Sequence, residues 1–129
     1  MNSCIIGIGS NMDADLNIPG SLKIIAQDLK IIQVSKMVKT KPVGFTDQAD
    51  FTNGAIKIET DWTQQKLSKY LKKVEDQMGR ERSSGKFSPR NIDLDMLIWN
   101  DQVIDPDYYT REFLRQSAAE LGFFRKDDL

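Results

Sequence analysis

Apolar and acidic residues alternate one by one between residues 92 and 96, and this pattern constrains the fold more than any other segment. In a β-strand, residues i and i+2 share a face. Asp93 and Asp95 are therefore predicted to project together, with Cα atoms roughly 6 to 7 Å apart. The residues between and beside them then point into a core; they are Ile92, Leu94 and Met96. The chain is expected to contain a sheet that is apolar on one face and acidic on the other at this strand.

Two adjacent carboxylates repel each other and lose hydration in a half-buried sheet, so a bound cation would stabilise the pair. Mg²⁺ prefers oxygen ligands of this kind. Basic residues precede the pair and could bind anionic oxygens beside the metal, as phosphoryl chemistry requires. These residues are Arg80, Arg82, Lys86 and Arg90. The alternative interpretation is a solvated edge strand that follows a charged turn.

Length and charge set limits on the class of protein. The chain has 129 residues and is 40% hydrophobic, which fits one globular domain over residues 1–129. Lys and Arg total 18 against 19 Asp and Glu, giving a net charge of −1, so no global charge directs the chain to nucleic acid or an anionic membrane. No apolar run approaches the roughly 18 residues that would span a bilayer. A soluble, cytoplasmic protein is expected.

Histidine is absent from the sequence, which excludes Ser/His/Asp triads, histidine-based zinc sites and an imidazole general base. The single cysteine, Cys4, cannot form an internal disulfide, and its apolar surroundings predict a small buried hydrophobic residue. Chemistry in this chain is therefore expected to depend on carboxylates, basic residues and metal.

The N-terminal half predicts a strand, a helix and two further strands. Residues 4–9 form a short apolar run typical of a buried strand. Apolar residues then recur at helical spacing from a possible N-cap at Ser21, with Pro19 and Gly20 at the helix entry. Residues 31–43 are expected to form one long, bulged strand.

Residues 51–60 alternate like a strand and place Phe51 and Asn53 on one face. A second helix is expected after a cap at Thr63 or Asp61, ending at Gly79.

A strand over residues 92–99 and a closing helix over residues 110–121 complete the predicted elements. The order β-α-β-β-α-β predicts an α+β fold of the ferredoxin-like class, an antiparallel sheet with helices packed on it. Because that fold hosts unrelated activities, it does not assign a function by itself.

Three segments together resemble the 6-hydroxymethyl-7,8-dihydropterin pyrophosphokinase family, which transfers a pyrophosphoryl group from ATP to the pterin hydroxymethyl group. They are IIGIGSN at residues 5–11, TKPVGFTDQADFTNGAIKIET at 40–60 and GRERSSGKFSPRNIDLDML at 79–97. For the first segment, a strand followed by a tight turn is the better interpretation of Gly7 and Gly9. The other two segments are much more specific. The resemblance extends to about residue 121.

The resemblance implies a nucleotide site with two magnesium ions, bound through Asp93 and Asp95. It also implies that basic residues bind the ATP phosphates, at positions Arg80, Arg82, Lys86, Arg90 and Arg111. Arg80, Arg82, Arg90 and Asp95 are the expected catalytic residues. Glu75 matches a family position near the nucleotide, although a solvated helix carboxylate is an equally good interpretation of this residue.

The resemblance implies a pterin slot that combines backbone at Thr40 and Val43, the Asn53 amide, and aromatic side chains. The expected aromatic residues are Phe51, Phe113 and Phe87, the last standing where the family has a loop tryptophan. A flat heterocycle stacks between aromatic rings, and an Asn offers both a donor and an acceptor to its amide-like edge. Ordinary core packing is the alternative for Phe51 and Phe113.

Phosphoryl-type transfer depends mainly on positioning and electrostatics, so Asp95 and bound metal could reduce the need for a dedicated base. A family Pro-His segment before Arg111 has no counterpart here. One alternative is therefore a catalytically impaired relative that binds nucleotide or pterin as a sensor or partner module. An RNA-binding ferredoxin-like domain is a more remote one. The main prediction is a monomeric, Mg²⁺-dependent pyrophosphokinase of folate biosynthesis that binds neither nucleic acid nor membrane.

Overall fold

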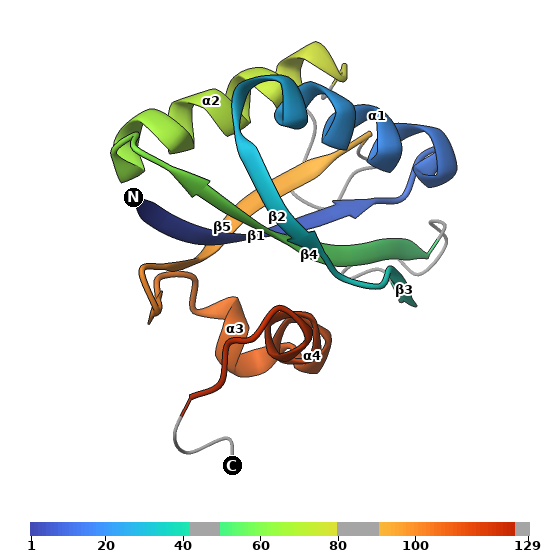
Figure 1. Ribbon diagram of the computed structural model, residues 1–129. Helices are drawn as coiled ribbons and strands as arrows, with labels where there is room; N and C mark the ends of the chain where they lie inside the picture. The colour runs from blue at the N-terminus through green and yellow to red at the C-terminus, as the bar shows by residue number, and fades with distance from the viewer. Residues whose placement is uncertain (42–49, 80–90, 126–129) are drawn as a thin grey trace.

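The computed structural model describes residues 1–41, 50–79 and 91–125, and it has an α+β architecture (Figure 1). The described strands form one six-stranded sheet in which each pairing is antiparallel. The strands are β1 (Asn2–Ser10), β2 (Lys30–Val34), β3 (Val38–Thr40), β4 (Phe51–Thr60), β5 (Asp93–Trp99) and β6 (Gln102–Val103). The helices are α1 (Ala14–Asp28), α2 (Gln64–Gln77), α3 (Asp107–Thr110) and α4 (Glu112–Glu120).

The strand order is β2-β4-β1-β5-β6, with β3 also paired to β4. β1 lies in the middle, where Gly9 is opposite Asn53 of β4 on one side and Asp93 of β5 on the other. β6 pairs with β5 only at Ile98 and Trp99, whereas Asp93 and Asp95 pair with β1, so the alternative of a solvated edge strand stays open for the acidic part of β5.

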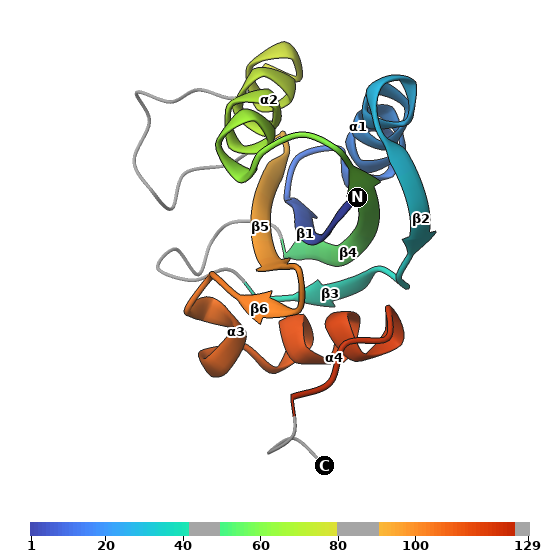
Figure 2. The same cartoon turned by 60° about the vertical axis from the view of Figure 1, so that its left-hand side comes forward.

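Helices cover both faces of the sheet. α1 and α2 lie side by side on one face, and α3 and α4 lie on the opposite face (Figures 1 and 2). The first layer buries the predicted alternating residues of β5, since Ile92 and Leu94 belong to its core and Met96 packs against it. Cys4 is also buried in this core, as predicted. The second layer has a smaller core, in which Tyr108 is 1% exposed.

The helix α1 begins at Ala14, so the predicted entry at Pro19 and Gly20 is wrong. Pro19 lies inside the helix, although a proline there removes one backbone hydrogen bond. Ile18 and Ile25 are buried two turns apart on the same helix face. Burial of an isoleucine stabilises by about 1.5–3 kcal/mol, which offsets the missing hydrogen bond.

The predicted strand over residues 31–43 is divided into β2 and β3. At the break, Ser35 uses its side chain in the ladder, because its Oγ accepts the Ala55 N–H at 2.8 Å. The Ser35 N–H still donates to the Ala55 carbonyl at 2.9 Å. A side chain thus replaces a main-chain acceptor, which interrupts the strand.

The predicted start and end of the second helix are confirmed. Thr63 caps α2, with Oγ1 accepting the Lys66 N–H at 3.1 Å. Gly79 follows the helix with φ of +86°, a backbone conformation that glycine adopts readily.

The predicted closing helix over residues 110–121 is confirmed as α4, and the short helix α3 before it was not predicted. The two helices are separate because Arg111 between them has an extended backbone. In the part of the chain that the structure describes, no helix has both the length and the apolar character needed to cross a membrane.

Candidate active site

A cavity of about 310 Å³ opens between the sheet and the α3–α4 layer. Four strands and both helices of this layer contribute to its wall, so it is built from segments far apart in the sequence. Seven residues that the sequence predicted as site residues lie in its lining: Thr40, Phe51, Asn53, Asp93, Asp95, Arg111 and Phe113.

The acidic side of the cavity belongs to β5. Asp93 and Asp95 both line the cavity, which confirms the predicted shared face of this strand. Asp95 is exposed and Asp93 is partly buried. Their cross-strand neighbours on β1 are Gly9 and Gly7, so no side chain from the central strand stands beside the carboxylates.

An amide and an aromatic ring line the cavity across the same strand. Asn53 and Phe51 of β4 both face it, as the alternation predicted. The Asn53 Nδ2 donates a hydrogen bond to the Thr40 Oγ1 at 2.6 Å. Phe51 belongs to neither hydrophobic core cluster, and this disfavours core packing as its role. Phe113 lines the cavity and also packs against the smaller core.

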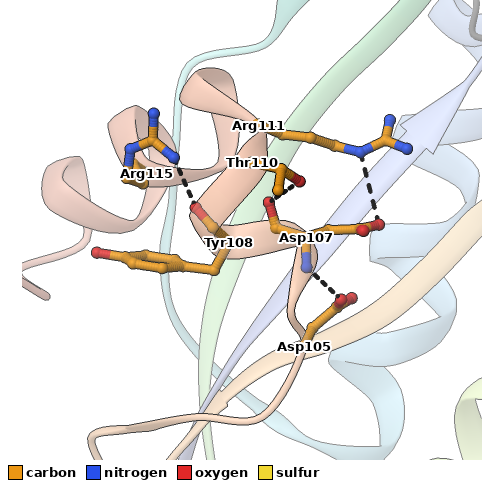
Figure 3. Close-up of polar contacts among 6 residues, drawn as sticks. All are labelled: Asp105, Asp107, Tyr108, Thr110, Arg111 and Arg115. Carbon is orange, nitrogen blue, oxygen red and sulfur yellow. Dashed lines mark hydrogen bonds and ion pairs between the residues drawn. The ribbon is translucent and has the colours of Figure 1, made fainter.

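A basic residue with an acidic partner forms the rim at α3. The Arg111 Nε lies 3.5 Å from the Asp107 Oδ2, one helical turn away, and both residues line the cavity (Figure 3). The Asp107 N–H in turn donates to the Asp105 Oδ1 at 2.9 Å. This geometry holds a guanidinium group at the cavity, where it could bind an anionic oxygen.

Sequence reasoning missed the contributions of Asp105, Asp107 and Gly9 to this cavity. A signal for the first two was present, because the Asp-x-Asp spacing at 105 and 107 repeats that of the β5 pair. Gly9 was interpreted as part of a strand followed by a turn. Gly9 is a strand residue, and its contribution to the cavity depends on the Asn53 side chain opposite it.

Glu75 is not among the residues that line the cavity. It is 2% exposed, so the alternative of a solvated helix carboxylate is wrong. Its Oε2 accepts the backbone N–H of Leu94 at 2.8 Å, between the two β5 aspartates. The predicted nucleotide contact of Glu75 stays a prediction.

The remaining predicted site residues lie outside the described residues. They are Val43, Arg80, Arg82, Lys86, Phe87 and Arg90. Among residues 1–41, 50–79 and 91–125, no group of three or more His, Cys, Asp or Glu side chains is placed to hold a metal ion. Any metal at the β5 pair would therefore need ligand oxygens from elsewhere, as Mg²⁺ commonly obtains from substrate phosphates.

The cavity thus has two chemically different sides, one acidic and one formed by an amide and aromatic rings. A family model matches the chain over residues 5–122, and its description is 7,8-dihydro-6-hydroxymethylpterin-pyrophosphokinase. This match covers most of the chain. The protein belongs to this family.

Individual relatives agree with the family. The 2-amino-4-hydroxy-6-hydroxymethyldihydropteridine pyrophosphokinase of Haemophilus influenzae is 31% identical over 133 residues, covering 95% of this chain and 82% of the relative. The enzyme of the same name from Bacillus subtilis is 30% identical, covering 93% of this chain and 78% of the relative. A folate synthesis bifunctional protein of Arabidopsis thaliana is 33% identical, covering 80% of this chain and 22% of the relative.

Proposed function

We propose that the protein transfers the pyrophosphoryl group of ATP to the hydroxymethyl group of 6-hydroxymethyl-7,8-dihydropterin and releases AMP, as a step of folate biosynthesis. The observation that carries this proposal is that the β5 carboxylates and the Asn53 amide line the same cavity. Family membership and the names of the relatives support the same reaction.

The pterin is assigned to the side of the cavity formed by β3, β4 and the start of α4. Phe51 and Phe113 would stack on the heterocycle, and Asn53 would bind its amide-like edge. Backbone at Thr40 and Val43 and the ring of Phe87 would complete the slot.

The nucleotide phosphates are assigned to the acidic side and the α3 rim. Asp93 and Asp95 fit two magnesium ions, because their carboxylates share one face of β5 and line the cavity. When bound, magnesium would neutralise charge on the ATP phosphates. The remaining phosphate contacts are assigned to basic residues, namely Arg80, Arg82, Lys86, Arg90 and Arg111. For Glu75, the bond to Leu94 favours a supporting role behind this side.

In the proposed reaction, the pterin hydroxyl oxygen forms a bond to the β-phosphorus of ATP. The bond between that phosphorus and the oxygen bridging to the α-phosphorus breaks, and AMP keeps the electron pair. The hydroxyl proton passes to solvent water, and Asp95 stays the carboxylate that would hold magnesium. The chain's own contribution is to orient both substrates and to place cations near the developing charge, with Arg80, Arg82 and Arg90 assigned to the transferring group.

A direct assay tests the proposal. Incubation with ATP, MgCl₂ and the hydroxymethyl dihydropterin should release AMP in step with pterin pyrophosphate. Asp95→Asn should abolish the release, whereas Asp61→Asn, a matched change at an exposed residue outside the cavity, should retain it. Release of ADP, or no turnover at high enzyme concentration, would contradict the proposal. ATP binding without turnover would favour the sensor alternative.

We further propose the ferredoxin-like class for the fold. The order β2-β4-β1-β5 and the antiparallel pairings support it, as does the placement of α1 and α2 on one face. The single domain over residues 1–129, the monomeric state, the cytoplasmic location and the absence of nucleic-acid binding stay predictions.

A further inference from the structure

Gly9 leaves the space in which the Asn53 amide lies. The two residues are opposite each other in the β1–β4 pairing. A Cβ atom built on Gly9 would lie 2.7 Å from the Asn53 Oδ1, which is closer than a carbon and an oxygen can approach without displacement. A side chain at position 9 and the present position of the Asn53 amide therefore exclude each other.

Thr40 holds the other end of the same amide. Its Oγ1 accepts the Asn53 Nδ2–H at 2.6 Å, from the neighbouring strand β3. The amide nitrogen thus points to Thr40, and the amide oxygen lies over Gly9 at the cavity floor. An Asn side chain has two rotatable bonds, and these two neighbours restrict both.

We propose that Gly9 and Thr40 are positioning residues that fix the Asn53 amide with its oxygen over the cavity floor, where it accepts a hydrogen bond from a ligand N–H. This inference rests on the proposed function and deepens it. It makes the site selective for a heterocycle whose bound edge carries N–H donors. The amino and ring N–H groups of a 2-amino-4-oxo pterin have this character.

The strand β1 offers a matched comparison for Gly9. Gly7 lies on the same strand and faces the same cavity, and its replacement by alanine removes the same backbone conformational freedom. A Cβ atom built on Gly7 would meet Leu97 Cδ1 at 3.4 Å, an ordinary van der Waals contact with a flexible side chain. Gly7→Ala therefore makes the same chemical change without touching the Asn53 amide.

Calorimetry with 6-hydroxymethyl-7,8-dihydropterin, in the presence of Mg²⁺ and a non-hydrolysable ATP analogue, tests the inference. Gly9→Ala should weaken pterin binding about tenfold or more, the loss expected when one well-placed hydrogen bond is removed. Gly7→Ala should show a clearly smaller change. Thr40→Val, which keeps the shape but removes the acceptor, should also weaken pterin binding, and Thr40→Ser should restore it.

The affinity for the ATP analogue separates positioning from general damage to the fold. It should stay within about twofold of wild type in Thr40→Val and Thr40→Ser, which leave Arg111 and the neighbours of the β5 carboxylates unchanged. In Gly9→Ala it should fall less than the pterin affinity, because Gly9 is also opposite Asp93. An equal loss of pterin and analogue affinity in Gly9→Ala would overturn the inference. Wild-type pterin affinity in both Gly9→Ala and Thr40→Val would overturn it as well, while leaving the proposed function intact. Failure of the wild-type protein to bind pterin would overturn both.

Discussion

Glu75 of α2 accepts the backbone N–H of Leu94 at 2.8 Å, at the strand position between Asp93 and Asp95. A buried helix side chain is thus bonded to the backbone of the strand that carries both acidic residues. Since the strand backbone sets where the aspartate side chains project, α2 supports the acidic side of the cavity from behind the sheet.

Replacing Glu75 should therefore lower stability. Glu75→Ala leaves the buried Leu94 N–H without this acceptor and should reduce the free energy of unfolding by about 2 kcal/mol. Glu75→Gln keeps an acceptor oxygen on a side chain of the same length, so its free energy of unfolding should fall less. Urea unfolding of the three proteins measures the difference. Equal stability of the Ala and Gln variants would show that the hydrogen bond contributes nothing measurable.

Arg111 should affect ATP more than it affects folding. Its ion pair with Asp107 is half exposed, and such pairs contribute at most about 1 kcal/mol to stability. Arg111→Ala should nevertheless raise the KM for ATP about tenfold, because a charge-assisted contact to phosphate is lost. Arg115→Ala is the control, since Arg115 donates to the Tyr108 carbonyl and does not line the cavity. Similar KM values for both variants would refute the assignment of Arg111.

Two glycines away from the cavity should respond to alanine in opposite directions. A Cβ atom on Gly54 would clash with the Met37 side chain and lie 3.1 Å from the Lys36 carbonyl, so Gly54→Ala should destabilise by about 1–3 kcal/mol. In α1, a Cβ atom on Gly20 would meet only Met78 Cε, at 3.5 Å. Gly20→Ala should stabilise by about 0.5–1 kcal/mol through helix propensity. Thermal unfolding distinguishes the two signs.

Alkaline pH should weaken the fold through Cys4. Burial raises the pKa of the Cys4 thiol from 9.0 to about 12. Between these values the unfolded chain has lost the proton and the folded chain has kept it, so the free energy of unfolding falls as pH rises. Between pH 8 and pH 10, Cys4 should lower the free energy of unfolding by about 1.4 kcal/mol.

Urea unfolding of the wild-type protein and Cys4→Ala at several pH values isolates the contribution of Cys4. The variant should start from a lower stability and show a shallower decline. Burial and the hydrogen bond to Asp28 also raise the pKa of Tyr70, and that contribution should persist in both proteins. Parallel pH profiles would show that Cys4 is not responsible.

Local alternation was sufficient to predict which residues share a face. The positions of Asp93 and Asp95, and of Phe51 and Asn53, follow from the two-residue period of a strand, and the cavity lining confirms both pairs. The link between Gly9 and Asn53 could not be predicted in the same way. It depends on the register between β1 and β4, strands far apart in the sequence.

The errors in the fold have a similar origin. Pro19 and Gly20 are typical of a helix start, but α1 already begins at Ala14, because Ile18 is buried in the core. The break between β2 and β3 arises from the Ser35 hydroxyl, which bonds to a strand partner that sequence reasoning had not placed opposite it. In both cases, tertiary contacts override the secondary-structure preference of the local sequence.

The floor of the cavity at Gly7 consists of main chain held on both sides by neighbouring strands. Such a surface has no rotamers to select, so a ligand that settles on it immobilises no side chain there. Ordering a flexible side chain on binding costs about 0.5–1.5 kcal/mol, and Gly7 avoids that cost. At this position, binding therefore requires no side-chain ordering.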